Sequence, residues 1–314
     1  MISTQELIRL VRGPIAVAEP LGPYTGLRIG GTADYFIKPL DRNDLCRALG
    51  FFSDLGFPYF VLGRGSRLLV HDKGFRGTVI STHFLDRLVI DGEMVEADAG
   101  VPVRMLVDRA AQASLGGLEE FGTGVGTVGG ALCRKEGLPG QGAGGSLEWV
   151  DVLRNGRVKR LRNGELRAGV RTLESGGDVV LGAGFRLSRT SQRNRPVSPV
   201  VRSAGPIGSP VDSGLQGALS GPVFLDPRER SEAAGHSAES LLDACGLKGF
   251  RHGGLSFSVF EANRIVNHGG ASSDDVLELV RMAREYVQQR FGVELELGLV
   301  LVGYNMNENH GLFN

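Results

Sequence analysis

The chain has 314 residues with 35 basic and 35 acidic side chains, so its formal net charge at pH 7 is zero. Balanced charge gives no broad attraction for nucleic acid or an anionic surface, and no run approaches the roughly 20 apolar residues that span a bilayer. Three widely spaced cysteines without a metal-ligand pattern, and an N-terminus without a signal-peptide core, predict a soluble, cytoplasmic protein with reduced thiols, no metal and about two domains.

The first 81 residues predict a small α/β unit. A short helix is expected to begin at Thr4. A longer amphipathic helix begins at Asp41, whose side chain suits the N-cap position, and ends before Pro58. Strands are expected at residues 35–39, 59–62 and 77–80.

Residues 82–190 predict a second unit. Asp91-Gly92 and Asn155-Gly156 favour the tight turns of β-hairpins, and apolar alternation flanks both. A helix is expected with Pro102 in its first turn, where the missing N–H has no intrahelical partner in any case. Residues 179–187 predict the strand that closes this unit.

The stretch 188–220 is rich in Ser, Arg, Pro and Gly, which is typical of a linker or a mobile loop. A third unit follows, with a helix capped by Ser237. The most regular amphipathic helix in the chain is expected from Ser273 to Gly292, with aspartates at the positive end of its dipole. A last strand is expected over 295–302, and residues 304–314 form a polar tail.

Glycine makes up five of the nine residues from Gly122 to Gly130. Without side chains the backbone can bend sharply or lie against a bulky ligand. The spacing Gly124-x-Gly126-x-x-Gly129 matches a dinucleotide fingerprint, but no good strand precedes it and the residues after Cys133 stop a helix early. We therefore favour a loop lying along a large planar cofactor over a nucleotide-binding fold.

A second glycine loop, Gly63-Arg64-Gly65-Ser66-Arg67, follows the strand at 59–62, and its backbone N–H groups suit phosphate oxygens. This loop, the run Gly126-Thr127-Val128-Gly129-Gly130 and the opening Leu27-Arg28-Ile29-Gly30-Gly31 together resemble the UDP-N-acetylenolpyruvoylglucosamine reductases. Those are the FAD enzymes that make UDP-N-acetylmuramate for peptidoglycan. The segments 245–254 and 262–271 extend the resemblance, which covers residues 20–303 and is to the shorter-chain type.

The resemblance implies an α+β fold: a two-part FAD-binding domain of the vanillyl-alcohol-oxidase type, followed by a smaller α/β substrate domain. It places the two parts at 1–81 and 82–190, a linker or mobile loop at 191–220, the substrate domain at 221–303 and a tail at 304–314. It implies non-covalent FAD, NADPH as the reductant and a UDP-sugar substrate, and it leaves protein partners unknown. The residues it assigns to FAD are Gly63, Gly65, Ser66, Arg67, Gly126, Thr127, Val128, Gly129 and Gly130, and those it assigns to substrate are Lys248 and Asn263. We expect a side chain added at Gly129 to occupy the space of the flavin.

The family's reaction leaves a carbanion beside the substrate carboxylate. An arginine and a glutamate stabilise it, and a serine hydroxyl protonates the carbon. Arg171 matches the arginine. The serine position is Pro222 and the glutamate position is Gly298, so two of the three groups are missing.

The polar site positions also depart from the family pattern, since Arg67 stands where an asparagine is usual, and Arg134–Glu136, Glu261 and Arg264 replace other site residues. Ser220 and Glu296 are the nearest substitutes for the missing groups. We expect impaired or lost catalysis. The alternatives are a non-catalytic paralogue that binds flavin, nucleotide sugar or a partner protein, and a flavin oxidase that acts on another substrate.

Overall fold

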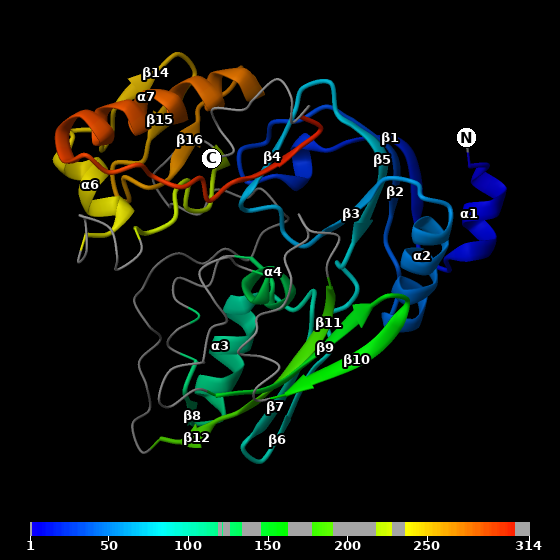
Figure 1. Ribbon diagram of the computed structural model, residues 1–314. Coiled ribbons are helices and arrows are strands. Elements are labelled where there is room, and N and C mark those ends of the chain that lie inside the picture. Colours follow the sequence, from blue (N-terminus) through cyan, green and yellow to red (C-terminus); the bar gives the residue numbers. More distant parts are fainter. Residues whose placement is uncertain are drawn as a thin grey trace. The chain divides into compact units, whose positions relative to one another are not determined.

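Figure 1 shows the fold of the chain as a computed structural model. The structure describes residues 2–118, 121, 126–133, 146–162, 178–190, 218–227 and 236–304. The chain forms two compact units, each assembled from separate stretches of sequence. The first unit draws on Met1–Val17, Asp34–Arg64 and Gly77–Val200, and the second on Ala18–Ala33, Gly65–Arg76 and Val201–Asn314.

The described elements mix helices and strands throughout the chain. The helices are α1 (Thr4–Leu10), the 3-10 helix η1 (Gly22–Tyr24), α2 (Arg42–Asp54), α3 (Val103–Gln112), α4 (Val128–Leu132), α6 (Ala238–Ala244) and α7 (Ser273–Phe291). The strands are β1 (Ile15–Pro20), β2 (Thr32–Ile37), β3 (Tyr59–Leu62), β4 (Leu68–Val70), β5 (Phe75–Ser81), β6 (Leu88–Asp91), β7 (Met94–Asp98), β8 (Leu115–Gly116), β9 (Leu147–Arg154), β10 (Arg157–Arg162), β11 (Val179–Arg186), β12 (Ser188–Arg189), β13 (Ala218–Leu219), β14 (Arg251–His252), β15 (Leu255–Phe257), β16 (Ile265–Asn267) and β17 (Val300–Val302). No helix among these is long and apolar enough to cross a membrane.

The first unit contains two sheets. One has the strand order β1-β2-β5-β3, with β3 parallel to β5, and its core includes the apolar faces of α1 and α2. The other is antiparallel, with the order β10-β9-β11-β7-β6, and its core includes residues of α3 and α4. Both predicted hairpins are confirmed: β6 pairs with β7, and β9 pairs with β10 around Asn155 and Gly156, which have φ angles of 50° and 71°.

A buried ion-pair network links α2 to the antiparallel sheet. The Nε of Arg42 donates to Asp98 on β7 at 2.9 Å, and its Nη1 donates to Asp151 on β9 at 3.1 Å. A Cβ at Gly182 on β11 would collide with the Nη2 of Arg42, so a glycine there leaves room for the guanidinium. Because both aspartates are buried, removing Arg42 would take a compensating positive charge away from two buried carboxylates, which destabilises the folded state.

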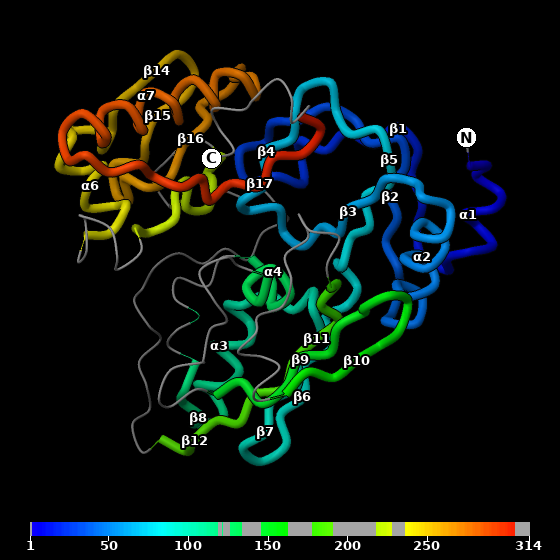
Figure 2. The backbone as a smooth tube through the Cα atoms, in the orientation of Figure 1, coloured from blue at the N-terminus to red at the C-terminus, as the bar shows by residue number. Residues whose placement is uncertain are grey.

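The second unit combines the sheet β13-β16-β15-β14 with α6 and α7. Its core also takes in Leu27, Ile29 and Leu69 from the N-terminal third of the chain. The parallel pair β4–β17 carries this connection, because Leu68 lies opposite Val300 and Val70 opposite Val302 (Figure 2).

The predicted starts of α1 and α7 are confirmed, but a cap, the place of Pro102 and the last strand differ from the prediction. The helices begin at Thr4 and Ser273, but the cap of α1 is Ser3, where Thr4 was expected. Ser3 and Ser272 are the caps because each forms a capping box with the acidic residue three positions on. Pro102 is the N-cap of α3 and lies just before its first turn. The predicted strand over 295–302 shortens to β17, because residues 295–299 pair only through the bridge between Leu297 and Phe224.

We expect the cap of α7 to contribute to stability above the acid range. The Ser272 N–H and hydroxyl both donate to Asp275, and these hydrogen bonds hold the pKa of Asp275 below its usual value of 3.8. A depressed folded-state pKa means that this stabilisation is present above the unfolded pKa and is lost as the pH falls through the folded one. Asp275→Asn should therefore lower the free energy of unfolding by about 1 kcal/mol at neutral pH, and the difference should vanish in strong acid.

The measurement is urea unfolding of both chains across the acid range. Asp274→Asn is the matched control, because Asp274 lies in the same first turn and is exposed. An equal loss of stability in both variants, or a loss for Asp275→Asn that does not change with pH, would contradict this account of the cap.

Candidate cofactor cavity and catalytic positions

The first unit encloses a cavity of about 70 Å³ between its two sheets. Four residues that the sequence assigned to FAD line it, although they come from two loops far apart in the chain: Gly63, Thr127, Gly129 and Gly130. The rest of the lining was not predicted from the sequence, and consists of Val61, Thr82, Ala99, Cys133, Val179 and Val180. Cys133 is the C-cap of α4 and the others lie in strands or at their ends, where a single sequence gives no sign of which residues will face a shared cavity.

The end of the glycine run becomes the short helix α4, and Thr127 is its N-cap. The Oγ1 of Thr127 accepts a hydrogen bond from the Gly130 N–H at 3.3 Å. A Cβ at Gly63 would lie 2.6 Å from this same Oγ1. The glycine loop at 63–67 therefore packs directly on the cap of α4, and glycine at 63 is required by that contact.

Two other predicted residues of this run serve to hold it in place. The Val128 N–H donates to Val101 at 2.9 Å, and the carbonyl of Gly126 accepts from the Val103 N–H at 3.2 Å. The side chain of Val128 is fully buried in the core of the antiparallel sheet. These contacts fix the backbone that borders the cavity.

The two adjacent glycines at the cavity differ in what a side chain would meet. A Cβ at Gly129 would lie 2.9 Å from the Cβ of Ala99, so a substitution there strikes the protein itself, and the expectation that it would also occupy the space of the flavin stays a prediction. A Cβ at Gly130 would meet only the Oγ1 of Thr127, at 3.5 Å, in ordinary contact. Gly130 is therefore the position from which a side chain can enter the cavity without disturbing α4.

Cys133 and Arg64 add two polar groups near this cavity that were not assigned from the sequence. Burial, together with the nearby Asp178 carboxylate, raises the pKa of the Cys133 thiol to about 11, so the thiol is protonated at neutral pH. Arg64 is half-buried, its pKa is lowered by that burial, and no described residue forms an ion pair with it. A partly desolvated guanidinium of this kind suits an anionic group such as a phosphate.

These residues fit FAD. Gly63 and Gly130 line the cavity without side chains, and Arg64, next in the chain after Gly63, carries a charge suited to the cofactor's pyrophosphate. The described residues include no group of three or more His, Cys, Asp or Glu that could hold a metal ion.

Residues 65–67 of the glycine loop at 63–67 belong to the second unit. Gly65 has a φ angle of 60°, and a Cβ there would collide with the carbonyl oxygen of Tyr24. The carbonyl of Ser66 accepts from the Gly221 N–H at 2.5 Å. The carbonyl of Arg67 accepts from the Val300 N–H at 2.7 Å. This loop therefore touches both segments that carry the family's catalytic positions.

Pro222 and Gly298, which occupy those catalytic positions, lie side by side. The Gly298 N–H donates to Val223 at 2.7 Å, and the Leu225 N–H donates to Glu296 at 2.9 Å. A Cβ at Gly298 would lie 3.2 Å from the carbonyl oxygen of Pro222 and 3.2 Å from the Cδ2 of Leu225. The positions for the serine and the glutamate are thus brought together, but neither holds a group that can move a proton.

Neither nearby substitute replaces the missing groups in this geometry. Ser220 is 2 % exposed, and its Oγ accepts from the Ile265 N–H at 2.8 Å, so it serves the pairing with β16. The carboxylate of Glu296 lies in the electrostatic environment of Arg284, whose pKa burial lowers while Glu294 and Glu296 act to raise it. Arg284 in turn donates to the carbonyl of Leu295 at 2.8 Å, so these charges belong to the packing of α7 against this segment.

The two predicted substrate residues have different surroundings. Lys248 lies in the turn after α6, partly exposed, with its Nζ 3.9 Å from Asp243. Asn263 is buried, and its amide is committed to Phe224: Oδ1 accepts from the backbone N–H at 2.8 Å and Nδ2 donates to the carbonyl at 2.9 Å. Asn263 therefore holds the strand that follows Pro222, and direct contact of either residue with substrate stays a prediction.

Some predictions fall on residues outside those that the structure describes. They are Arg171, the run 122–125, the segment 191–217 and the tail 305–314. The role of Arg171 and the proposed boundaries of the linker and domains therefore stay predictions.

Both halves of the chain match known protein families. Residues 33–167 match the family described as FAD binding domain, and residues 213–302 match the C-terminal domain of UDP-N-acetylenolpyruvoylglucosamine reductase. The UDP-N-acetylenolpyruvoylglucosamine reductase of Chloroherpeton thalassium is 36% identical over 97% of this chain and 98% of its own length. That of Geobacter metallireducens is 38% identical, over 93% of this chain and 95% of its own.

A solved structure agrees with these sequence relatives. The crystal structure of UDP-N-acetylenolpyruvylglucosamine reductase from Thermus caldophilus matches with a TM-score of 0.66 and 30% identity, covering 93% of this chain and 99% of that one. The predicted α+β fold with an FAD-binding domain is confirmed, as is FAD as the cofactor, with NADPH the family's reductant. The chain belongs to the family of UDP-N-acetylenolpyruvoylglucosamine reductases.

Proposed function

We propose that this chain binds FAD and a UDP-sugar as its family does, but does not reduce the enolpyruvyl ether at a rate useful for peptidoglycan synthesis. One observation carries the proposal. The two positions at which the family places its proton donor and its carboxylate are adjacent in the second unit, and they are Pro222 and Gly298. A cytoplasmic location follows from the same family resemblance and is part of the proposal.

The reaction asks two things of the protein after hydride reaches the substrate. Bound FAD supplies the hydride transfer, with NADPH as the reductant. The protein must then stabilise charge that develops beside the substrate carboxylate and place a proton on the carbon. Pro222 has neither a hydroxyl nor a backbone N–H to donate. Gly298 has no side chain, and its N–H is already bonded to Val223.

The packing around Gly298 also supports the proposal. A Cβ there would meet Leu225, Phe224 and Pro222 atoms, each at 3.2 Å, which is tighter than ordinary contact. One side-chain atom of Leu225 and backbone atoms of Phe224 and Pro222 therefore already border the space that the Cβ of a glutamate needs. Losing a general acid alone typically costs ~10²–10⁴ in rate, and removing an electrostatic stabiliser costs ~10²–10³. Because such effects are not additive, we expect a combined loss of at least ~10³.

The same observation favours the alternative of a binding protein without turnover. The cavity-lining glycines, the cap of α4 and the half-buried Arg64 remain, while the proton donor and carboxylate are absent. No described residue points to a different oxidisable substrate, so the flavin-oxidase alternative stays a hypothesis.

The test is NADPH consumption that depends on added UDP-N-acetylglucosamine enolpyruvate. The FAD-loaded chain is assayed beside the Chloroherpeton thalassium relative under identical conditions. We expect this chain to retain bound FAD yet to be at least ~10³-fold slower. A rate within tenfold of the relative's would overturn the proposal. Ser220 and Glu296 would then be the next residues to mutate.

A further inference from the structure

The two edges of the antiparallel sheet in the first unit are protected differently. The edge strand β10 has the sequence Arg157-Val-Lys-Arg-Leu-Arg162, in which four of six residues are basic. The opposite edge strand, β6, reads Leu88-Val-Ile-Asp91, with three apolar residues in succession. Proteins usually guard exposed edges with charges, prolines or bulges, because unpaired backbone groups there recruit another strand. The basic side chains of β10 protect that edge from pairing with another strand, whereas the apolar residues of β6 give no such protection.

The backbone of β6 turns a regular set of unpaired groups away from the sheet. The carbonyl of Arg87 accepts from the Asp98 N–H at 2.9 Å, so Arg87 faces β7. In an antiparallel pair alternate residues face the partner strand, and Val89 and Asp91 therefore face β7 as well. Leu88 and Ile90 direct their N–H and C=O groups outward, where no described strand pairs with them.

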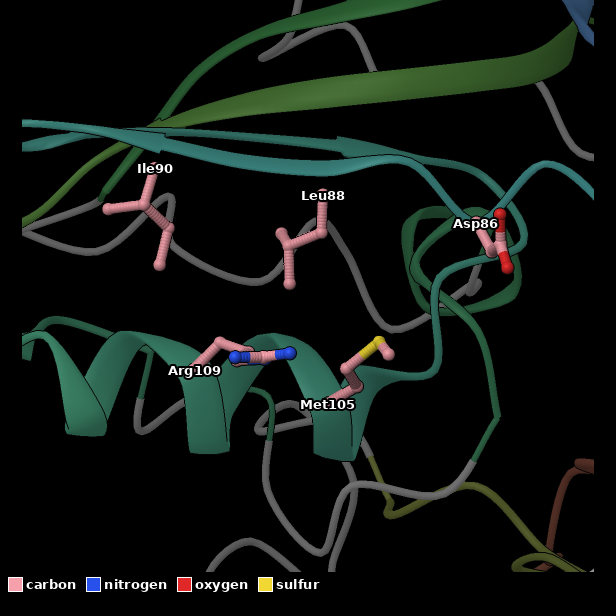
Figure 3. A pocket seen from close by; sticks show the side chains of 5 residues that line it. All are labelled: Asp86, Leu88, Ile90, Met105 and Arg109. Carbon is pink, nitrogen blue, oxygen red and sulfur yellow. The ribbon is translucent and has the colours of Figure 1, made fainter.

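An open groove lies beneath this edge, between β6 and α3 (Figure 3). Leu88 and Ile90 reach from β6 toward the helix, and Met105, which is 39% exposed, faces them. The volume of this groove is about 370 Å³. Asp86 lies at the end where β6 begins, and the Arg109 side chain lies along α3 between the positions of Ile90 and Leu88. Both charged side chains are exposed, and neither forms an ion pair with any described residue.

We propose that β6 pairs with β6 of a second copy of this chain, antiparallel and centred on Val89. In this register Arg87 lies opposite Asp91 of the partner subunit, so both ends of the strand pair carry opposite charges. Leu88 lies opposite Ile90 of the partner subunit, and these are the residues whose backbone groups are free to bond. The hydrogen-bond alternation and the charge pattern thus select the same register independently.

The groove supports the same arrangement. A two-fold axis through Val89 exchanges the ends of the strand, so Asp86 of one copy lies near the Ile90 end of the other copy. The Arg109 side chain of that other copy is close by, and no described residue forms an ion pair with it. The apolar side chains of both grooves then cover one another. The shared surface is small, so we expect a reversible dimer that dissociates on dilution.

Charge exchange across the strand pair tests the register. Arg87→Asp and Asp91→Arg each create two like-charged pairs per dimer, and each should raise the dimer dissociation constant by about tenfold or more. The double variant Arg87→Asp/Asp91→Arg restores opposite charges and should restore dimerisation. Arg157→Asp, on the guarded edge β10, is the matched control and should change nothing. Sedimentation velocity over a range of protein concentrations reports the association directly.

A crosslink provides a second readout that does not depend on the charges. Val89 faces itself across the axis as a non-hydrogen-bonded pair, with Cα atoms about 4.5 Å apart, which a disulfide can span. Val89→Cys should give a covalent dimer on mild oxidation, and Val158→Cys on β10 should not. A chain that is monomeric at all concentrations, a double variant that stays dissociated, or equal crosslinking of both cysteine variants would overturn the proposal.

Discussion

Restoring both missing groups, by Pro222→Ser together with Gly298→Glu, should raise substrate-dependent NADPH consumption by at least ~10² over the unmodified chain. Each single change should give much less, because the hydroxyl and the carboxylate serve one transition state and their effects are not additive. The two positions already lie together, since a Cβ at Gly298 is 3.2 Å from the carbonyl oxygen of Pro222. The measurement is the rate of NADPH loss with and without UDP-N-acetylglucosamine enolpyruvate.

The matched control is Pro222→Ala/Gly298→Ala. It makes the same backbone changes and adds the same Cβ beside Leu225, but supplies no hydroxyl and no carboxylate. The control should remain as slow as the unmodified chain. If it gained as much activity as the Ser/Glu variant, the effect would come from relaxed packing and not from restored proton transfer.

Gly130→Val should sharply weaken FAD binding while leaving the protein folded. A Cβ at Gly130 meets only the Thr127 Oγ1 at 3.5 Å, and Gly130 lines the cavity. Overfilling a packed site typically costs ~1–3 kcal/mol, which corresponds to a rise in the FAD dissociation constant of roughly tenfold to hundredfold. Fluorescence titration of the apoprotein with FAD gives this constant, and thermal unfolding without FAD checks the fold.

Gly50→Val is the matched control for this prediction. Gly50 also lies within a helix, α2, and a Cβ there has no neighbour within 4 Å. Valine is a better helix former than glycine, so neither change should destabilise its helix. Unchanged FAD affinity in Gly130→Val would show that the cavity beside α4 is not the cofactor site.

Local sequence signals predicted the elements whose formation depends on nearby residues. The Asp41 cap is confirmed by its hydrogen bond from the Asp44 N–H at 2.8 Å, and Gly292 ends α7 with a φ angle of 67°. The hairpin at Asn155-Gly156 is confirmed for the same reason, because only the turn residues decide it. Caps and turns are fixed within four or five residues, so a single sequence suffices.

Long-range pairing could not be predicted in this way. β4 and β17 are separated by more than two hundred residues and each has only three residues, so neither carries a periodic pattern. Their pairing nevertheless places Leu69 in the core of the second unit. The helix α4 was missed because glycines are poor helix formers, and the Thr127 cap and the contact with Ala99 outweigh that preference.

In the candidate site, too, some residues could be predicted from the sequence and others could not. The glycines at 63, 129 and 130 were assigned to the cofactor from the family resemblance, and they do line one cavity. Val61, Cys133 and Val179 complete it only because β3, α4 and β11 meet in space. Asn263 was assigned to substrate, whereas its amide holds the backbone of Phe224, a partner 39 residues away that its own neighbours in sequence do not reveal.

The most direct test of the central claim follows the visible absorption of bound FAD without oxygen. The FAD-loaded chain is first reduced with one equivalent of NADPH, and UDP-N-acetylglucosamine enolpyruvate is then added. Because Pro222 and Gly298 supply neither proton donor nor carboxylate, we predict that the absorption, once lost to NADPH, does not return within minutes. Its return within seconds, with formation of UDP-N-acetylmuramate, would show that the chain is a working reductase and would contradict this account.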